Sequence, residues 1–346
     1  MENPTIKTRR RLTKKKKKKI KAKTVIISLI SFIVAMPLVA WLLVEMWLNS
    51  WTGLFNFGDS NTSRNFNPID AESGEFIDDD INAYKPPEID VYKDENVLNV
   101  LMIGTDERQK DFDPTARSDS MMILSLNFKT NTIRLASLAR NIPVYVPELG
   151  KNDLLTHIHH YGGEDMLLEY VRSYLGVDVD KYVRTNFYTF EKLIDSVGGV
   201  DVELTYDEAL GLNGEHPLGS NAITKARVKE GSNHLSGYDA LQYSRLRYID
   251  DDYHRIVRQR NVVMSVIKSA KGMSLNELNK MLQTVAPLVK TNFTQNEIKS
   301  VVYRLVDFLT GADIENISIP ENNQVMINKE YSHEKYSQVL RDFLYQ

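Results

Sequence analysis

The chain has 346 residues, of which 42% are hydrophobic and 26% are charged, and its formal net charge is −3. These are values of a globular protein, and the absence of cysteine excludes a disulfide scaffold, a thiolate metal site and a cysteine nucleophile. The charge is uneven along the chain: residues 1–23 carry +11, residues 49–95 carry −8 and residues 96–346 carry −5. The C-terminal part therefore fits neither a basic nucleic-acid-binding protein nor a polyacidic one.

An apolar segment follows the basic N-terminus. Thr24 to Val44 is a run of 21 residues without a charge, which is long enough to cross the hydrocarbon core of a bilayer as a helix. The block Lys14 to Lys19 precedes the run, and tryptophans follow it at positions 41, 47 and 51. The positive-inside rule and the aromatic belt predict a transmembrane helix over residues 24–48 behind a cytoplasmic tail, residues 1–23.

Two other interpretations of this region remain open. A cleaved signal peptide has a shorter apolar region and a small-residue cleavage site, whereas Glu45-Met46-Trp47 is a poor site, so an uncleaved anchor is favoured. The lysine block is also compatible with a nuclear or nucleic-acid-binding patch, although beside a membrane span it is more simply a topology signal. Residues 49–95 are rich in Gly, Asn, Ser and Asp, which predicts an acidic extracellular linker.

Residues 96–346 have the pattern of one folded domain. Short apolar runs predict strands over residues 97–103, 121–128, 132–139, 182–188 and 200–204, with a hairpin turn at 129–131. Helical spacing and capping patterns predict helices over residues 163–175, 190–197, 237–245 and 255–271, after the capping boxes at 274–277 and 294–297, and near 332–344. Strands and helices interleave, so the predicted class is α/β, with a mixed central sheet flanked by helices on both faces.

Two carboxylates follow the first predicted strand. Asp106 comes directly after it in Gly104-Thr105-Asp106, and Asp119 stands thirteen residues later in Arg117-Ser118-Asp119. Ligands in open α/β sheets bind beyond the carboxyl ends of strands, and Mg²⁺ prefers a few carboxylates with phosphate oxygens and water. The alternative is that Asp106 caps a turn and Arg117 pairs with Asp119.

Arginines are dense in the second half of the domain. Arg140 follows the third predicted strand, Arg245 and Arg247 lie near a helix end, and Arg255 and Gln259 are four residues apart on one helix face. Because the arginine fork suits oxyanions, this cluster predicts a phosphate or pyrophosphate ligand. Ion pairs with residues 250–252 are the alternative.

The histidines at positions 157, 159 and 160 show no zinc-protease pattern, and hydrogen-bonding or packing roles are favoured for them. The chain also lacks a G-x-S-x-G elbow, a G-x-x-x-x-G-K-[ST] loop and a G-x-G-x-x-G fingerprint. These absences argue against hydrolase, NTPase and dinucleotide-binding functions.

In this order the motifs resemble the LytR-CpsA-Psr family of bacterial envelope proteins, over about Asn96 to Ala270. The segments that carry the resemblance are residues 104–106, 117–122, 137–140, 156–157, 161–163, 197–202, 235–237, 240–241, 243–247, 252–255 and 258–260. A short cytoplasmic tail, one membrane span and an exported domain are also similar to this family.

The resemblance implies a phosphotransferase that moves an anionic glycopolymer, such as wall teichoic acid or capsule, from a polyprenyl-pyrophosphate carrier to peptidoglycan. It implies Mg²⁺, with Mn²⁺ as a substitute, held by Asp106 and Asp119, and it places Arg117 with them as catalytic. The residues implied for pyrophosphate binding are Arg117, Arg140, Arg245, Arg247, Arg255 and Gln259. It also implies that apolar helices sheath the polyprenyl tail at the outer face of a Gram-positive-type cell membrane.

The sequence departs from the family pattern at two positions. Asn141 stands where Asp usually follows the motif arginine, and Leu154 stands where Lys often precedes the Thr-His pair, with Lys151 as a neighbouring cation. These departures keep two other functions open: a non-catalytic envelope regulator that binds the carrier, and a polyprenyl-pyrophosphate pyrophosphatase.

Overall fold

The structure, a computed structural model, describes residues 41–58, 89–305, 308, 311–327 and 330–346. The chain divides into two compact units, Met1–Gly53 and Leu54–Gln346. The described part of the first unit is a helix over residues 41–52, in which the rings of Trp47 and Trp51 lie 5.8 Å apart, edge to face. Across the described ranges, no helix is both long enough and apolar enough to span a bilayer. The predicted basic tail and most of the predicted membrane span and linker lie outside these ranges.

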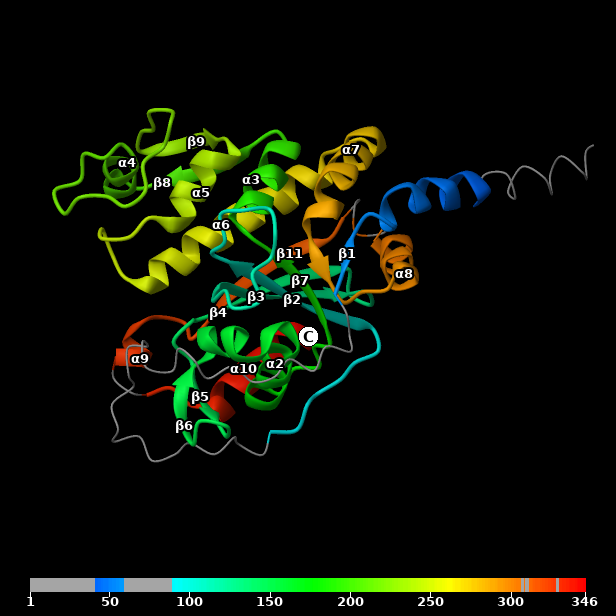
Figure 1. The fold of residues 1–346 in the computed structure, drawn as a ribbon, viewed down its shortest axis with the longest axis horizontal. Coiled ribbons are helices and arrows are strands. Elements are labelled where there is room, and N and C mark those ends of the chain that lie inside the picture. Colours follow the sequence, from blue (N-terminus) through cyan, green and yellow to red (C-terminus); the bar gives the residue numbers. More distant parts are fainter. Residues whose placement is uncertain (1–40, 59–88, 306–307, 309–310, 328–329) are drawn as a thin grey trace, which may run out of the picture. The chain divides into compact units, whose positions relative to one another are not determined.

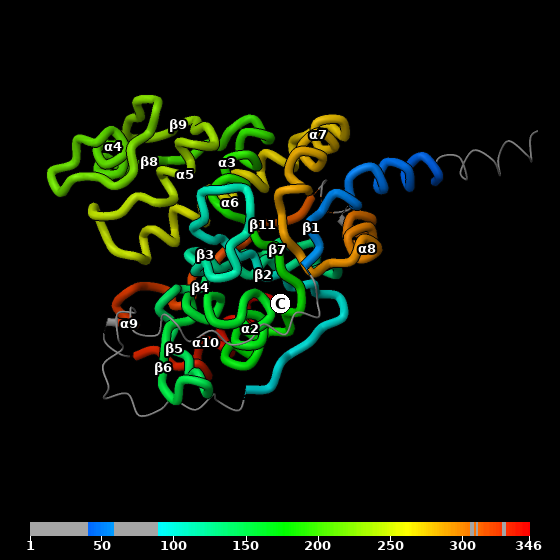
Figure 2. Tube along the Cα trace, in the orientation of Figure 1, coloured from blue at the N-terminus to red at the C-terminus, as the bar shows by residue number. Residues whose placement is uncertain are grey.

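A seven-stranded mixed sheet organises the described part of the second unit (Figure 1). Its strands are β1 (Asn56–Phe57), β2 (Val97–Thr105), β3 (Ser118–Asn127), β4 (Thr132–Leu138), β7 (Lys181–Thr185), β10 (Lys290–Thr291) and β11 (Asp313–Ile319). The spatial order is β1-β10-β7-β2-β3-β4-β11, with β2, β3 and β4 antiparallel, and with β7 parallel to β2 and β11 parallel to β4. The trace in Figure 2 shows how β11, near the end of the chain, returns to lie beside β4.

The central strands are apolar on both faces, as expected of strands covered on both sides. Odd-numbered residues, such as Leu101, Ile103 and Ile123, belong to the core under one face. Even-numbered residues, such as Met102 and Met122, line a cavity over the other face. This alternation of side chains explains why the short run at 97–103 has no polar face.

Helices α2 (Leu155–Leu175) and α10 (His333–Tyr345) cover the first face (Figure 1). The hairpin of β5 (Pro143–Val146) and β6 (Lys151–Leu154) packs beside α2, and α9 (Gln324–Ile327) precedes α10. Helix α2 begins eight residues before the predicted start at Gly163. Gly163 has φ 70° and ψ −157° and kinks the helix, a conformation that favours glycine.

The opposite face carries α3 (Phe187–Ser196), α5 (Gly237–Arg245) and α6 (Asp252–Lys271) (Figure 1). A small lobe beyond them contains β8 (Val200–Leu204), β9 (Gly231–Leu235) and α4 (Tyr206–Leu212), joined to these helices by one apolar cluster. The remaining elements are α7 (Leu275–Val285), η1 (Ala286–Leu288) and α8 (Gln295–Leu305).

Most predicted elements are confirmed, with shifted ends. The predicted caps are present: Ser236 accepts a hydrogen bond from the Asp239 amide, and Ser274 forms a capping box with Glu277. The predicted strand at 182–188 is too long, because Asn186 caps α3 and the helix begins at Phe187. The predicted linker is not wholly irregular, since residues 49–52 are helical and β1 adds to the sheet edge beside β10.

Candidate functional site

An apolar cavity of about 200 Å³ lies between the sheet and helices α3, α5 and α6. Met102 and Met122 form part of its floor, and Phe190, Val263 and Ile267 form part of its roof. Polar residues, including Asp119, Arg245 and Gln259, also line it. The cavity thus combines apolar walls with a charged end, which suits a ligand with an apolar chain and a polar head.

The charged end of this cavity is built where β2 ends and β3 begins. Gly104 pairs with Ser120 across the two strands, and a register shift follows at Thr105. A Cβ at position 104 would lie 3.0 Å from the Cβ of Ser120, so a larger residue would crowd the cavity wall. Asp106 leaves the strand end directly after the shift, and Asp119 is in the partner strand, so the strand pairing brings the two predicted carboxylates together although they are distant in sequence.

Arg140 links Asp119 to helix α6. Its Nη1 donates to Asp119 at 2.9 Å, while Nε and Nη2 donate to the two oxygens of Asp252 at 3.2 and 2.9 Å. Although burial opposes it, the charges of Asp252 and Asp119 raise the pKa of Arg140. The alternative in which Arg117 pairs with Asp119 is not borne out: Arg140 pairs with that carboxylate, and Arg117 is exposed beside Asp106.

Arg255 is the most deeply buried of the predicted arginines, with 3% of its side chain exposed. Its Nη2 lies 2.8 Å from Asp252 Oδ1, close enough for an ion pair but not aligned for a hydrogen bond, and within the described residues its Nε has no hydrogen-bond acceptor. Burial, followed by the nearby charge of Arg140, lowers the pKa of Arg255 to about 10. A buried cation with unused donors is costly by itself, and an anionic ligand would compensate it.

Arg245 and Arg247 complete the cluster at the end of α5. The Arg245 guanidinium lies 4.7 Å from the ring centre of Phe187, and burial together with the charges of Arg108 and Arg247 lowers its pKa. Arg247 is half exposed, and its Nη2 lies 4.0 Å from Asp119. Their loop is fixed by Asn221, which donates to the Arg245 carbonyl and accepts from the Arg247 amide.

The two carboxylates fit a divalent cation by their charge. Burial, followed by the charge of Asp119, raises the pKa of Asp106. The two carboxylates therefore repel each other. Arg140 contacts one oxygen of Asp119 and leaves Oδ2 facing Arg247 at the longer distance of 4.0 Å. In the described ranges no group of three or more acidic or histidine side chains could hold a metal by itself. Mg²⁺ prefers one or two carboxylates together with phosphate oxygens and water, so these two carboxylates match the protein's share of such a site.

The other candidates have structural partners. His157 and Tyr161 bond to Asp153, next to Leu154, and His159 and His160 donate through Nδ1 to the carbonyls of Ala116 and Thr115. These contacts confirm the hydrogen-bonding roles predicted for the histidines. Lys151 opens β6 opposite Val146, and its predicted contribution to the site stays a prediction.

The sequence did not single out Asp252 as the centre of the cluster. It stands in the segment 252–255 that carries the resemblance, and it is one of the three acids of the alternative ion-pair interpretation. That interpretation is confirmed for Asp252, which pairs with Arg140 and Arg255, and for its neighbour Asp250, which pairs with the buried Arg258. Asp252 differs because it contacts two site arginines at once. Its position as the first residue of α6, beside Arg140 of a distant strand end, depends on how the helix packs on the sheet.

The chain is similar to known proteins in sequence and in fold. The model of the LytR_cpsA_psr family matches residues 69–343. A protein of Bacillus mycoides named polyisoprenyl-teichoic acid–peptidoglycan teichoic acid transferase TagU is 33% identical over 226 residues, which are 64% of this chain and 68% of that protein. The TagU of Bacillus anthracis is 34% identical over 226 residues, with 64% and 69% covered.

Solved structures share the fold. TagT bound to LIIa-WTA has a TM-score of 0.55 and 26% identity, covering 72% of this chain and 91% of that chain. The protein gbs0355 of Streptococcus agalactiae has a TM-score of 0.54 and 27% identity, covering 64% and 77%. The mixed sheet with helices on both faces, predicted from the alternation of strands and helices, is thus a fold that these proteins have in common.

Proposed function

This protein belongs to the LytR_cpsA_psr family, and we propose that it transfers an anionic glycopolymer, of the wall teichoic acid or capsule type, from a polyprenyl-pyrophosphate carrier to peptidoglycan. One observation carries the proposal: an apolar cavity of about 200 Å³ ends at a cluster of arginines. An isoprenoid chain matches the cavity, and a pyrophosphate head matches the cluster. The relatives named TagU, and the similar structure of TagT bound to LIIa-WTA, support the same substrate class.

The arginines differ in how they would hold the pyrophosphate. Arg255 offers buried donors that have no acceptor in the described structure. Arg140 is already oriented by Asp252, and the half-exposed Arg247 stands at the entrance. Arg245 and Gln259 line the cavity itself, so they would contact the phosphate next to the isoprenoid chain. Arg117, whose charge acts on Asp106, would contact the same phosphate from the side of the acceptor.

The proposed step is a phosphoryl transfer. A hydroxyl oxygen of the acceptor glycan forms a bond to the phosphorus that bears the polymer, and the bond from this phosphorus to the bridging oxygen breaks. Polyprenyl phosphate leaves, and the hydroxyl proton is released to a base or to water. Such reactions depend on positioning and charge neutralisation more than on a covalent nucleophile, and the arginine cluster would supply both.

Asp106 and Asp119 would hold Mg²⁺, or Mn²⁺ in its place, at the pyrophosphate. The ion would neutralise charge that develops on the phosphate oxygens. Arg140 keeps Asp119 oriented from the other side, and the mutual repulsion that raises the pKa of Asp106 would then disappear.

The proposed location is the outer face of the cell membrane. The carrier lipid resides in a bilayer, and the uncharged run from Thr24 to Val44, which lies almost wholly outside the described residues, would anchor the enzyme there. The basic tail would remain in the cytoplasm and Gln346 outside. Protease added to intact protoplasts should degrade residues 96–346, and protection of that domain would contradict this orientation.

The deciding experiment uses purified full-length protein with a polyprenyl-pyrophosphate-linked polymer and peptidoglycan. Transfer is demonstrated when the polymer becomes attached to the peptidoglycan and polyprenyl phosphate is released only in the presence of this acceptor. Release without acceptor indicates a pyrophosphatase, and binding without any release indicates a carrier-binding regulator. Either of these results would refute the proposed transferase.

A further inference from the structure

A second cavity, of about 650 Å³, lies beneath the loop of residues 106–117 that joins β2 to β3. Its lining comes from this loop and from His160 of α2. It shares no residue with the apolar cavity, but Thr105 lines one and Asp106 lines the other. Asp106 of this cavity and Asp119 of the apolar cavity are close enough for their charges to interact, so both cavities border the proposed transfer site.

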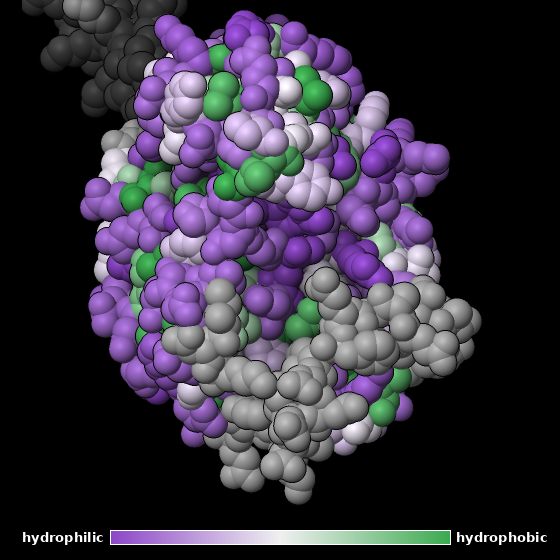
Figure 3. Space-filling view, turned by 90° about the vertical axis from the view of Figure 1, so that its left-hand side faces the viewer, coloured by the Kyte–Doolittle hydropathy of each residue, from purple (hydrophilic) through white to green (hydrophobic). Residues whose placement is uncertain are grey.

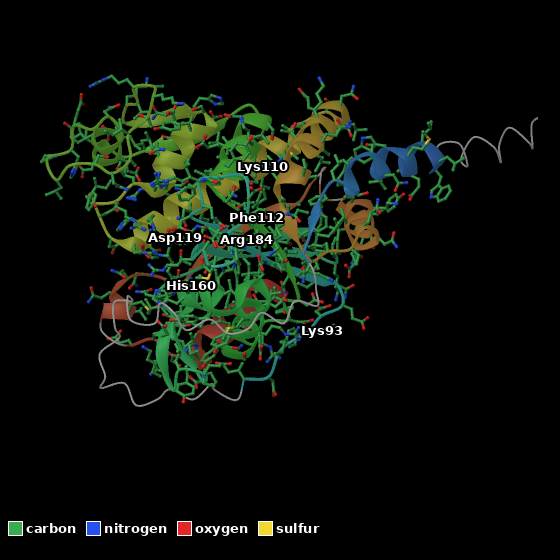
Figure 4. All side chains as sticks on the ribbon, in the orientation of Figure 1. Lys93, Lys110, Phe112, Asp119, His160 and Arg184 are labelled. Carbon is green, nitrogen blue, oxygen red and sulfur yellow. The ribbon has the colours of Figure 1, made fainter. Side chains whose placement is uncertain are left out.

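Buried Arg184 of β7 holds this loop in place. Its side chain has no exposed surface, and it donates to the Asp113 carbonyl at 2.7 Å, to Glu164 of α2 at 2.8 Å and to Glu107. The ring of Phe112 lies 4.9 Å from the guanidinium. Figure 4 shows Phe112 and Arg184 close together, with Asp119 to their left and His160 below and to the left. The cavity is therefore preformed, because its walls are bonded to the buried frame.

Further bonds fix the loop at both ends. Asn186 donates to the Gln109 carbonyl at 2.9 Å, and the Phe187 amide donates to the Glu107 carbonyl at 3.1 Å. His159 and His160 bond to the carbonyls of Ala116 and Thr115. A loop tied to α2, β7 and α3 keeps its shape when a ligand enters, which lowers the entropic cost of binding.

The charges of the two cavities are opposite. The polar cavity is lined by four acids, Asp106, Glu107, Asp111 and Asp113, and by a single cation, Arg117. The arginine cluster lies on the other side of the carboxylates Asp106 and Asp119. An anionic polymer is drawn to the arginines and repelled by the acidic cavity. The surface in Figure 3 is hydrophilic around a central hollow, as a face that admits polar ligands should be.

Three acids of this cavity suit hydroxyl groups: Glu107, Asp111 and Asp113, which are separate from the proposed metal ligand Asp106. The Glu107 side chain is 9% exposed, and its Oε2 has no hydrogen-bond partner in the described structure, so one buried acceptor remains unused at the cavity wall. Saccharide hydroxyls donate hydrogen bonds to carboxylates, and the Phe112 ring and Gln109 provide the apolar and amide surfaces that a sugar also uses.

We propose that this acidic cavity binds the acceptor as an uncharged saccharide, and that its charge keeps the anionic donor polymer out. The proposal rests on the proposed function, since it assigns the second substrate of the same reaction. It gives the two substrates separate entrances that meet at Asp106 and Asp119.

The test measures saccharide binding directly, without turnover. The probe is an uncharged β-1,4-linked N-acetylhexosamine tetrasaccharide, titrated by ligand-observed NMR into full-length protein in detergent. Gln109→Ala and Asp111→Lys change lining side chains that make no side-chain bond in the described structure, so they should fold normally. Asp313→Lys is the matched control, because Asp313 pairs with Thr132 at the opposite end of the sheet from Arg140.

We expect both cavity variants to weaken tetrasaccharide binding at least fivefold, with the control unchanged and geranyl pyrophosphate binding unchanged in all three. A soluble polyglycerol phosphate should compete with the tetrasaccharide in Asp111→Lys but not in the wild type. No saccharide binding by the wild type, or equal binding by all variants, would overturn the inference. Because this readout needs no transfer, an inactive protein that still binds the saccharide through Gln109 and Asp111 would refute the transferase function alone.

Discussion

Asp252 binds Arg140 through both carboxylate oxygens, at 3.2 and 2.9 Å, and thereby aims the third nitrogen of that guanidinium at Asp119, 2.9 Å away. The same carboxylate lies 2.8 Å from Nη2 of buried Arg255, and the charge of Asp119 also favours the charged form of that arginine. One acid at the start of α6 thus offsets the charge of two arginines.

Asp252→Ala should therefore destabilise the free protein and make it more responsive to anions. Loss of a charge-assisted hydrogen bond costs about 1.5–3 kcal/mol, and Arg140 and Arg255 would repel each other. Inorganic pyrophosphate should raise the melting temperature of this variant more than that of the wild type. Asp250→Ala is the control, because Asp250 pairs with Arg258 away from the cluster. An equal pyrophosphate response in all three proteins would contradict the role of Asp252.

Substitutions of Arg247 test whether the anion is bound by the planar guanidinium group or only by its positive charge. Arg247→Ala should weaken pyrophosphate binding by roughly 10- to 100-fold, which corresponds to one hydrogen bond to a charged group. Arg247→Lys should also bind clearly less well, because a point charge cannot replace a planar fork. Calorimetric titration with geranyl pyrophosphate measures both. If both variants bind like the wild type, the half-exposed arginine is only a solvated surface residue.

Substitutions of Asp119 test whether the transfer reaction needs a bound metal ion. Asp119→Ala should abolish transfer, and Asp119→Asn should be nearly as inactive, because the amide keeps the shape and loses the charge that would hold Mg²⁺. Chelator should inactivate the wild type, and Mg²⁺ or Mn²⁺ should restore the wild type alone. A melting curve in parallel excludes unfolding, since Asp119 also pairs with Arg140. Transfer that needs no metal, or full activity of Asp119→Asn, would rule out this mechanism.

Val263 tests the apolar cavity. It lines the roof, so Val263→Trp should fill space that the isoprenoid chain would occupy. Each buried methylene contributes about 0.8 kcal/mol, so the loss of a few of them should weaken a long-chain polyprenyl phosphate by tenfold or more. Inorganic pyrophosphate binding should not change. Val339→Trp, on the exposed side of α10, is the control. Unaltered binding of the long chain by Val263→Trp would place the lipid elsewhere.

The lowered pKa of Glu164 predicts that the folded protein loses stability at acidic pH. Burial alone would raise the pKa of its carboxyl, but His159, Lys290 and Arg184 together lower it far below its ordinary value of 4.5. Because the native state holds the proton less tightly than the unfolded chain, this stabilisation is complete above about pH 4.5 and is lost as the pH falls below it. Urea unfolding between pH 7 and 3 should show a shallower decline for Glu164→Gln than for exposed Glu230→Gln. Parallel curves would contradict this assignment.

The sequence by itself determined the local elements. The capping boxes at Ser274 and Thr294 act within one helical turn, and Asn131, with φ 55°, closes the hairpin through a conformation that Asn tolerates. The proximity of Asp106 and Asp119 could also be predicted from the sequence, because an antiparallel pair brings the end of one strand beside the start of the next. The order of the motifs led to the family resemblance, and the resemblance implied the roles of the individual site residues.

Only the tertiary structure decided which charges meet. Arg140 and Asp252 are 112 positions apart, and no local pattern encodes the packing of α6 against the end of β4. Arg184 lies in a short strand of alternating pattern, where a charge would normally face solvent; it is buried because α2 and the 106–117 loop fold over it and bring Glu164 and Glu107 as partners. Burial of a charge depends on partners from distant segments, since the desolvation cost is met only when all of them assemble.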